Sequence, residues 1–442
     1  MADLRVHPRR LPPTLVKRDT PRLDEQELAR AAVTFETMEA TVVRGSPEKP
    51  KILSSAHGPL RHLLLAYPSS AGGDDVYRDV FLDLFAKLPA RTELTIVTHP
   101  SALADVQQAV DQLRTESATT LIEAPDYLEF TVWAEDPYVV VDDVGASEQK
   151  TFLVEPLEFP RYGDSAVADL VAEATPIQST QAPLYFQGGN VLIGDDFVLI
   201  GIDYLLNTRS VFQEQHPVRN VPSDPSKLDQ FVRDLFRQTF DPDRELHFVG
   251  TRHRVPEETT RPTRVGGKKW TEVVYAGTGT RQPIFHIDMF ISLAGRADSG
   301  RYRVLVGSPA AADRILGRRS LPHALDPIFD DVARNLGRMG YDVVRNPLPL
   351  VYVDDPSERQ RMWYFATSNN CLVEIDDDRS VWIPTYGHEP WPELAATDDA
   401  NREIWEGLGF TVHQLADFHP FAQNLGSVHC IKKYLGRGRA LD

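Results

Sequence analysis

Short apolar runs of strand length alternate with amphipathic stretches of helix length along most of the chain. Residues 60–68 and 93–99 are apolar runs, and residues 74–88 between them carry apolar side chains at helical spacing. The same alternation returns in three later stretches, at residues 197–250, 302–347 and 380–416. Strands that alternate with helices predict an α/β fold class. Because no long flexible linker separates these units, we expect repeated supersecondary units that close around one core.

Two segments depart from this alternation. The first 55 residues are rich in Pro, Arg and Glu, and only residues 23–40 have helical spacing, so we expect an N-terminal arm, partly extended, over residues 1–55. Residues 56–442 are then expected to form a single domain. The stretch 250–270 is basic, contains glycine and has no regular pattern, which we interpret as a surface insertion.

Charge and cysteine content limit the kinds of ligand and the cellular compartment that we expect for this protein. The chain of 442 residues has a formal net charge of −17, which argues against a sequence-independent grip on nucleic acid or on an anionic membrane and favours cationic ligands. Two cysteines imply no disulfide framework and suit a reducing compartment. The first residues lack the apolar segment of a secretory signal, and no apolar run approaches the roughly 20 residues that span a bilayer. We therefore expect a cytoplasmic protein.

Four residues are candidates for chemistry. Cys430 follows small residues in the segment GSVHC, which leave room for a ligand, and a cysteine reacts as the thiolate, so it needs positive charge or a base nearby. His286 and Asp288 lie in a segment with strand character, where alternate side chains share one face about 7 Å apart. Asp136 precedes a proline, which favours extended geometry and suits a carboxylate at a loop mouth. His429 would point to the opposite face of an extended strand, so His286 is the better candidate base.

Other motifs set limits on the chemistry. Residues 188–190, Gly-Gly-Asn, lie between two β-rich stretches, where the chain either enters a hairpin or lets a ligand approach its backbone closely. Cys371 precedes an apolar run and is expected to pack in the core. Metal-ligand spacings, phosphate-binding glycine loops and the G-x-S-x-G elbow of serine hydrolases are all missing from the sequence. We therefore expect neither a metal nor an organic cofactor.

Four motifs, taken in order and spacing, resemble those of the guanidino-group modifying enzymes. They are W-x-x-D at residues 133–136, G-G-N at residues 188–190, H-x-D at residues 286–288 and H-C at residues 429–430. The resemblance extends over most of the chain beyond residue 60, and it is closest to the peptidylarginine and agmatine deiminases. It implies the pentein fold, a five-bladed α/β propeller with pseudo-fivefold symmetry, which agrees with the repeated units.

The resemblance also implies roles for the motif residues. Asp136 and Asp288 would hold a guanidinium, which is planar, permanently protonated and rich in N–H donors, so that two carboxylates suit it. His286 would act as general acid and base, and Cys430 would be the nucleophile. Further substrate contacts are expected from Trp133, Gly189 and Asn190. The implied enzyme is a deiminase, a hydrolase that converts the guanidinium to a ureido group plus ammonia through a covalent thiouronium on the cysteine.

Several alternatives stay open on these residues alone. The substrate is peptidylarginine, arginine or a small guanidine such as agmatine. An amidinotransferase would use the same site with an amine as second nucleophile, and a noncatalytic guanidinium-binding propeller would keep only the fold. A homo-oligomer is compatible with the sequence but not specified by it. Two carboxylates have no assigned role: Glu135, where relatives commonly carry Arg or Gln, adds negative charge near the expected pocket, and Asp203 is a candidate for orienting the histidine.

Overall fold

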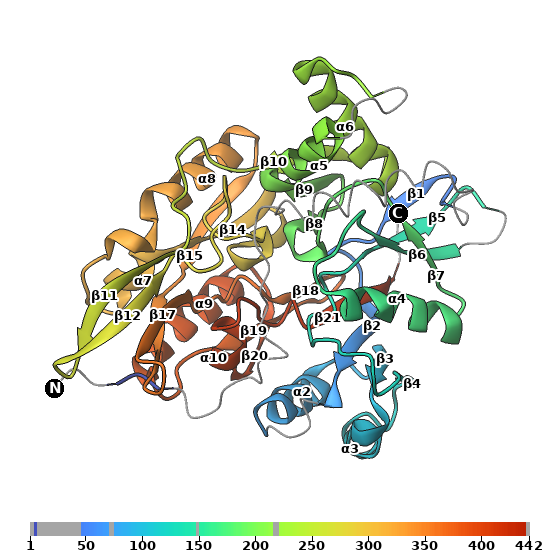
Figure 1. The fold of residues 1–442 in the computed structure, drawn as a ribbon. Helices are drawn as coiled ribbons and strands as arrows, with labels where there is room; N and C mark the ends of the chain where they lie inside the picture. Colours follow the sequence, from blue (N-terminus) through green and yellow to red (C-terminus); the bar gives the residue numbers. More distant parts are fainter. Residues whose placement is uncertain (1–3, 7–45, 70–74, 147–149, 215–220, 439–442) are drawn as a thin grey trace.

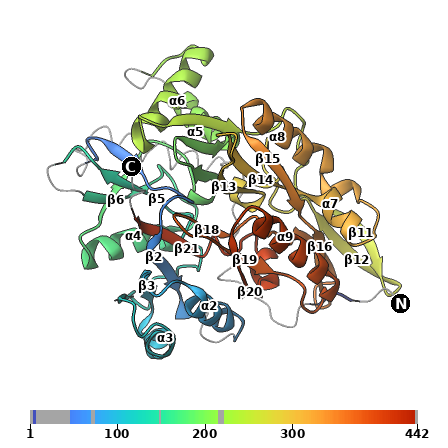
Figure 2. The ribbon, with the colours of Figure 1, turned by 180° about the vertical axis from the view of Figure 1, so that it is seen from behind.

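The structure, a computed structural model, describes residues 4–6, 46–69, 75–146, 150–214 and 221–438. Most of the expected N-terminal arm, including the helix predicted at residues 23–40, lies outside these ranges. Five small sheets of similar topology surround a common centre, and most of their helices lie at the periphery (Figure 1 and Figure 2).

Each of the five units has an antiparallel strand pair, then helices, then a strand parallel to the second strand of the pair. The first unit contains β21 (Lys432–Arg437), β2 (Leu60–Tyr67), α2 (Asp75–Lys87) and β3 (Glu93–Thr98), and continues into α3 (Pro100–Leu113) and β4 (Thr119–Glu123). The second contains β5 (Val139–Asp143), β6 (Lys150–Glu155), α4 (Tyr162–Ala174) and β7 (Gln178–Gln181), with β1 (Pro50–Ile52) at its edge.

The remaining three units repeat the same order. The third contains β8 (Val191–Ile193), β9 (Phe197–Gly201), α5 (Ile202–Glu214), α6 (Pro225–Phe240) and β10 (Glu245–Val249). The fourth contains β13 (Ile291–Arg296), β14 (Tyr302–Ser308), α7 (Pro309–Ile315), α8 (Asp326–Arg338) and β15 (Asp342–Pro347). The fifth contains β18 (Leu372–Ile375), β19 (Arg379–Thr385), α9 (Ala395–Gly407) and β20 (Thr411–Asp417), and α10 (His419–Ala422) follows it. This order confirms the predicted α/β propeller of five blades.

The helices form where capping residues and apolar spacing coincide. The α6 helix is an example, because Asp224 caps its N-terminus by accepting hydrogen bonds from the amides of Ser226 and Lys227 at 3.1 and 3.0 Å. Pro225 at the first position is compatible with the start of a helix. The residues buried by this helix recur every four positions and are Leu228, Val232, Phe236 and Phe240. They anchor the helix on a core shared by the second and third units.

The ring closes where the last strand of the chain pairs with an early one. β21 lies antiparallel to β2, with Leu63 opposite Tyr434 and Leu65 opposite Lys432. The first unit is therefore assembled from segments at opposite ends of the described chain. A sheet completed in this way holds the final segment, which includes Cys430, against the ring.

A sixth sheet lies outside the five units. It contains β11 (Thr259–Val265), β12 (Lys268–Val274), β16 (Leu350–Asp355) and β17 (Gln360–Phe365). Residues 250–270, interpreted from the sequence as a surface insertion without regular pattern, contain β11 and the start of β12, which form a hairpin outside the five units. Gly266 and Gly267 make its two-residue turn with φ of 56° and 78°, a left-handed conformation that favours glycine. β11 is almost fully exposed, so its strand carries no apolar alternation that could reveal it.

Among the described residues, the core consists of three clusters of buried apolar side chains and is rich in aromatic residues. Trp133, Trp382 and Trp405 are all buried in the largest cluster, which joins the first, fourth and fifth units. A separate cluster lies under α5 and α6. In the described ranges, no helix is long and apolar enough to cross a membrane.

Candidate active site

The candidate site lies where the five units meet, and each unit places one polar residue there. These residues stand one to three positions before the first strand of their unit: Asp136 before β5, Asn190 before β8, Asp288 before β13, Asn370 before β18 and Cys430 before β21. Equivalent positions in a closed ring of similar units converge on its centre. This repeated placement explains why the motif residues are far apart in sequence and close in space.

Gly189 marks the middle of the predicted site. A Cβ atom on Gly189 would lie 2.6 Å from His286 Nδ1, 3.1 Å from Asp136 Oδ1 and 3.1 Å from Asp288 Oδ2. The predicted imidazole and both predicted carboxylates therefore surround one point, and only glycine leaves that point empty. Gly189 itself belongs to a short 3₁₀ helix, η3 (Gly188–Asn190).

The segment that carries His286 and Asp288 is a turn, so the prediction that both lie on a strand was wrong. A 3₁₀ helix, η4 (Ile287–Met289), follows His286, and β13 begins only at Ile291. The amide of Ile287 donates to Asn190 Oδ1 at 2.9 Å, a side-chain contact that satisfies a backbone donor at the start of this turn. Both side chains nevertheless face the site, because the turn brings them to the same side.

The contacts of His286 define which ring nitrogen faces the site. Nε2 lies 2.7 Å from Gln187 Oε1 and 2.9 Å from the Tyr204 hydroxyl. A carbonyl oxygen can only accept, so Nε2 carries hydrogen and donates to Gln187. Nδ1 is then the nitrogen available to gain or lose a proton, and it lies 3.7 Å from Asp136 Oδ1.

Asp136 already binds one guanidinium, that of Arg161. Arg161 Nη2 lies 2.9 Å from Asp136 Oδ2, and its Nε lies 2.6 Å from Asp164 Oδ2. Asp164 in turn accepts from the backbone amide and hydroxyl of Thr131. This chain of contacts fixes the orientation of Asp136 and turns Oδ1 toward Gly189 and His286.

The thiol of Cys430 lies among polar groups. Its Sγ is 3.2 Å from Asn370 Nδ2, which can donate to it, and 3.7 Å from Asp288 Oδ2. Asn370 Oδ1 accepts from the amide of His429 at 2.8 Å, so this side chain holds both the backbone and the sulfur. We did not predict Asn370 from the sequence. Its position before β18, equivalent to those of the other site residues, is the signal that could have identified it.

His429 also belongs to the site, and the prediction that it points away was wrong. The backbone turns between Ser427 and Cys430, whose amide donates to the Ser427 carbonyl at 3.1 Å, so the strand alternation assumed for this segment does not apply. His429 Nδ1 lies 2.9 Å from Asp288 Oδ2. Burial, together with the neighbouring Lys432, lowers the pKa of His429 to about 4. The ring is therefore neutral at pH 7, and Nδ1 donates to the carboxylate.

Glu135 lies in a buried ion cluster, away from solvent. Its Oε2 is 2.7 Å from Lys432 Nζ, and its Oε1 is 2.9 Å from Lys433 Nζ. Burial lowers the pKa of both lysines, and the carboxylate between them acts in the opposite direction. Glu135 therefore neutralises one of two positive charges that follow Cys430 in the chain. It does not add unbalanced negative charge to the pocket.

Three further residues singled out in the sequence have contacts that hold neighbouring parts of the structure in place. Asn190 bonds Gln282 and the turn at Ile287. Trp133 packs edge-on against Phe421 in the core. Asp203 accepts hydrogen bonds from the backbone amides of Thr280 and Arg281 at 2.7 and 3.0 Å and thereby holds a loop; its role in orienting the histidine stays a prediction.

The site is enclosed. Asp136, His286 and Cys430 are 0% exposed and Asp288 is 1% exposed. A cavity of about 10 Å³, enough for about one water, adjoins Asp288 and His429. Within the described ranges, no cluster of three or more His, Cys, Asp or Glu residues is arranged to hold a metal ion.

Comparisons with known proteins point to one fold. No protein-family model matches the sequence, and no curated protein sequence matches it. A structure provisionally named an agmatine deiminase matches with a TM-score of 0.58 and 14% identity, covering 90% of this chain and 99% of the other. One provisionally named a peptidyl-arginine deiminase matches with a TM-score of 0.55 and 12% identity, covering 88% and 100%. A Cys→Ser variant of C. jejuni agmatine deiminase with substrate bound gives 0.52 and 12%, covering 88% and 97%. The chain therefore has the pentein fold, the fold of the guanidino-group modifying enzymes.

Proposed function

We propose that the protein is a deiminase that hydrolyses a guanidinium group to a ureido group and ammonia. The observation that carries the proposal is the convergence of His286 Nδ1, Asp136 Oδ1 and Asp288 Oδ2 around Gly189, with the thiol of Cys430 beside Asp288. An imidazole, two carboxylates and a thiol in one enclosed centre are the groups needed to bind a planar cation and attack its carbon.

The two carboxylates suit a guanidinium ligand in different ways. Asp288 Oδ1 is buried and has no hydrogen-bond partner among the described residues, so an N–H donor from a ligand would satisfy it. Asp136 holds Arg161 through Oδ2 and would meet the substrate through Oδ1. Each carboxylate then receives one edge of the substrate cation, and the low dielectric of the enclosed site strengthens both contacts.

The reaction follows from these positions. The Cys430 thiolate attacks the guanidinium carbon and forms a C–S bond, while the N–H group of Asn370 stabilises the sulfur. His286, protonated at Nδ1, gives its proton to the departing nitrogen, the C–N bond breaks, and ammonia leaves a thiouronium. Neutral His286 then takes a proton from water as the oxygen adds to the same carbon. The C–S bond breaks, the thiolate returns, and the hydroxyl proton passes to solvent, where it accounts for the protonation of ammonia, as the neutral ureido product is released.

The substrate class is a compound with a free guanidinium end. The fold match to an agmatine deiminase solved with its substrate supports this class. Because all four proposed catalytic residues are enclosed, we expect a small guanidine such as agmatine or arginine to be preferred over an arginyl side chain in a folded protein.

The proposal is tested with a substrate panel. Agmatine, arginine and a blocked arginyl peptide are incubated with the protein, and ammonia and ureido product are measured together. Cys430→Ser should abolish both products, whereas Cys371→Ser should keep them. Cys371 is a matched control because it is also buried, and burial raises the pKa of its thiol to about 12.

Two outcomes would contradict the proposal. Unchanged ammonia release by Cys430→Ser would exclude the assigned nucleophile. Transfer of the amidino group to added glycine, with the amine product of the donor and no ureido product, would identify an amidinotransferase instead. Alkylation of Cys430 by a haloacetamidine, with protection by substrate, gives an independent check on the site.

A further inference from the structure

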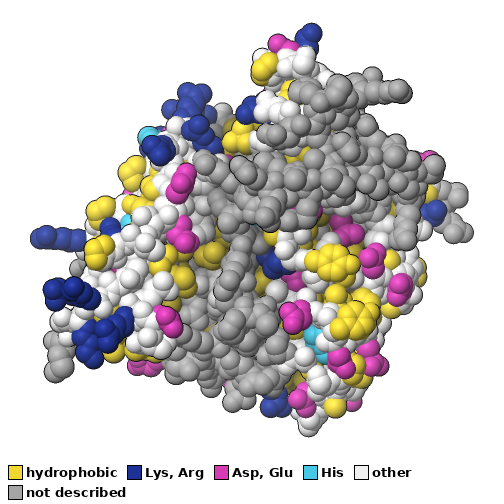
Figure 3. Space-filling model, viewed as in Figure 1, with side chains coloured by type: hydrophobic (Ala, Val, Ile, Leu, Met, Phe, Trp, Pro, Cys, Tyr) yellow, Lys and Arg dark blue, Asp and Glu magenta, His cyan; other side chains and the backbone are white. Residues whose placement is uncertain are grey.

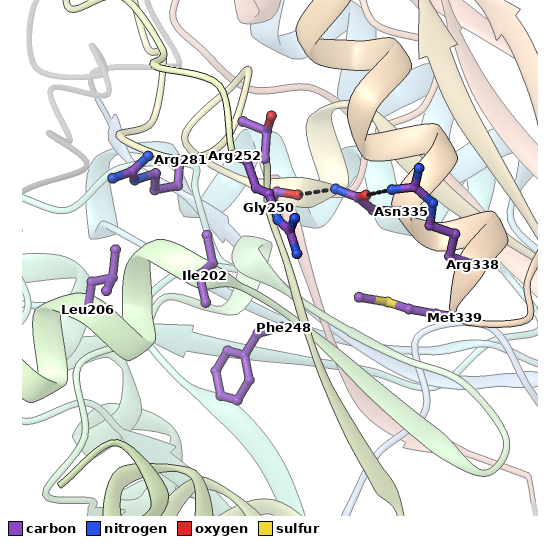
Figure 4. A pocket seen from close by; sticks show the side chains of 10 residues that line it. Ile202, Leu206, Phe248, Gly250, Arg252, Arg281, Asn335, Arg338 and Met339 are labelled. Atoms are coloured by element: carbon purple, nitrogen blue, oxygen red, sulfur yellow. Dashed lines mark hydrogen bonds between the residues drawn. The ribbon is translucent and has the colours of Figure 1, made fainter. Parts of the chain in front are cut away.

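A second cavity, of about 590 Å³, lies between the third and fourth units (Figure 4). Its apolar wall is formed by Ile202 at the start of α5, Phe248 of β10 and Met339 just after α8. Its polar rim is formed by three arginines, Arg252, Arg281 and Arg338. A volume of this size is typical of small-molecule sites, which combine an apolar lining with a few polar groups.

The rim is positive in a strongly acidic protein. Arg252 reaches over the middle of the cavity, and Arg281 and Arg338 lie on opposite sides of it (Figure 4). Arg338 donates to Asn335 Oδ1 at 3.2 Å. Among the described residues no carboxylate is paired with the three guanidiniums, although the backbone amides of Arg252 and Arg281 donate to Asp331 and Asp203. The neighbouring helices differ, since Arg209 and Arg233 share Asp229. Lys and Arg side chains also gather over α8 on the surface (Figure 3).

The apolar wall sets the second requirement for a ligand. Met339 is 43% exposed, which leaves a large apolar side chain at the cavity edge. Phe248 lines the cavity and lies below Ile202 and Gly250 in the view of Figure 4. A ligand that covers these side chains gains hydrophobic stabilisation in addition to its contacts with the arginines. The combination fits an anion that also has an apolar body.

The cavity is separate from the catalytic centre. Ile202 and Arg281 line it, and the next residues along the chain, Asp203 and Gln282, face inward. Gln282 bonds Asn190, the residue that supports the turn after His286. The polar layer of Asp203, Gln282 and Asn190 therefore stands between the cavity and the predicted reaction site.

We propose that this cavity is a binding site for an organic anion, a carboxylate or a phosphate monoester with an apolar tail. The head group pairs with Arg252 and Arg281, for which guanidinium geometry is well suited. The tail covers Phe248 and Met339. The long-range electrostatic field of the acidic protein repels anions, so binding of the anion depends on its local contacts with the arginines. These contacts are screened by salt, so the affinity should fall as the salt concentration rises.

Direct binding tests the proposal without using turnover. Hexanoate, hexyl phosphate, inorganic phosphate and neutral hexanamide are titrated calorimetrically at low ionic strength. One or both hexyl anions should bind, and the stronger one identifies the head group, whereas hexanamide should not bind. Arg252→Gln and Arg281→Gln should weaken hexyl anion binding at least about tenfold, because each removes a charged hydrogen-bond donor.

Matched variants separate this site from general charge effects. Arg314→Gln removes an exposed arginine of α7 that does not line the cavity, and it should leave binding unchanged. Met339→Gln should weaken the hexyl anions and leave inorganic phosphate unaffected. Cys430→Ser should bind as the parent protein does, so failure of the proposed deiminase activity does not affect the result. Binding of neither hexyl anion, or equal weakening by Arg314→Gln and Arg252→Gln, would overturn the proposal.

Discussion

The substitution Glu135→Gln tests the buried ion cluster beside the predicted nucleophile. Glu135 contacts Lys432 and Lys433, and the three side chains are between 0% and 6% exposed. Glutamine keeps the shape and one acceptor but removes the charge that balances two buried ammonium groups. The same change at Glu393 removes an exposed pair with Arg5, in which the side chains are 43% and 28% exposed.

The expected magnitude follows from this difference in burial. Removal of one partner from a buried ion pair typically costs about 3–5 kcal/mol, because the remaining charge is left without compensation in a low dielectric. Loss of an exposed pair costs at most about 1 kcal/mol. We therefore expect Glu135→Gln to lower the free energy of unfolding by about 3–5 kcal/mol, and Glu393→Gln to lower it by about 1 kcal/mol or less.

Urea unfolding followed by tryptophan fluorescence and circular dichroism measures both changes. The double variant Glu135→Gln/Lys432→Met should recover part of the loss, since it removes one of the two stranded charges. Equal losses in Glu135→Gln and Glu393→Gln would refute the reasoning. So would a double variant that is less stable than Glu135→Gln, because the cost would then not arise from uncompensated charge.

Three further predictions concern single residues of the site. Gly189→Ala should lower kcat/KM for a guanidine substrate about 100-fold, because its Cβ would displace the imidazole of His286 that we propose as the acid and base. Gly337→Ala, whose Cβ would meet nothing within 4 Å, should leave activity intact. Normal activity of Gly189→Ala would contradict the proposed geometry. Asn370→Ala should slow alkylation of the thiol by a haloacetamidine about tenfold at pH 7, because it removes the N–H donor to the sulfur, and an unchanged alkylation rate would exclude this role. The pKa of His429 is about 4 in the folded protein and ordinary in the unfolded chain, so the unfolded chain binds more protons as the pH falls. The free energy of unfolding of the parent protein should therefore fall by about 2 kcal/mol from this group between pH 7.5 and pH 5. His429→Asn should show that much less loss in urea unfolding, and an identical pH dependence would contradict the assignment.

The fold class could be predicted because the sequence patterns that indicate strands and helices are local. The strand and helix patterns of α6, α8 and their neighbouring strands lie within short windows, and their alternation indicated repeated units before any contact was known. The number of blades came from the resemblance, and the sheet topology confirms it. The β11–β12 hairpin could not be predicted from periodicity, since its exposed side chains bury too little surface to impose a pattern.

The site could be predicted only in part. The motif residues Asp136, His286 and Asp288 do meet around Gly189, and their catalytic roles stay predictions. His429 was misjudged because the reasoning assumed an extended strand where the chain turns. A local sequence pattern cannot show which residues far apart in the chain come into contact.

The partners of Glu135 illustrate the same limit. Its carboxylate could have faced solvent or the pocket, and the answer depends on two lysines nearly three hundred positions later in the chain. Asn370 was overlooked for a related reason, because its role depends on equivalence between units that share no sequence motif.

The pairing of β21 with β2 has a consequence for how the proposed active site forms. The strand that closes the circle begins two residues after Cys430, so the sulfur reaches its partners only when the two most distant segments of the ring join. Contacts of such large sequence separation form late, because the entropy of closing a long loop must be overcome first. Helices and individual blades can therefore be complete in a chain that has no turnover. We therefore expect turnover to appear in one step, when β21 pairs with β2 and closes the ring.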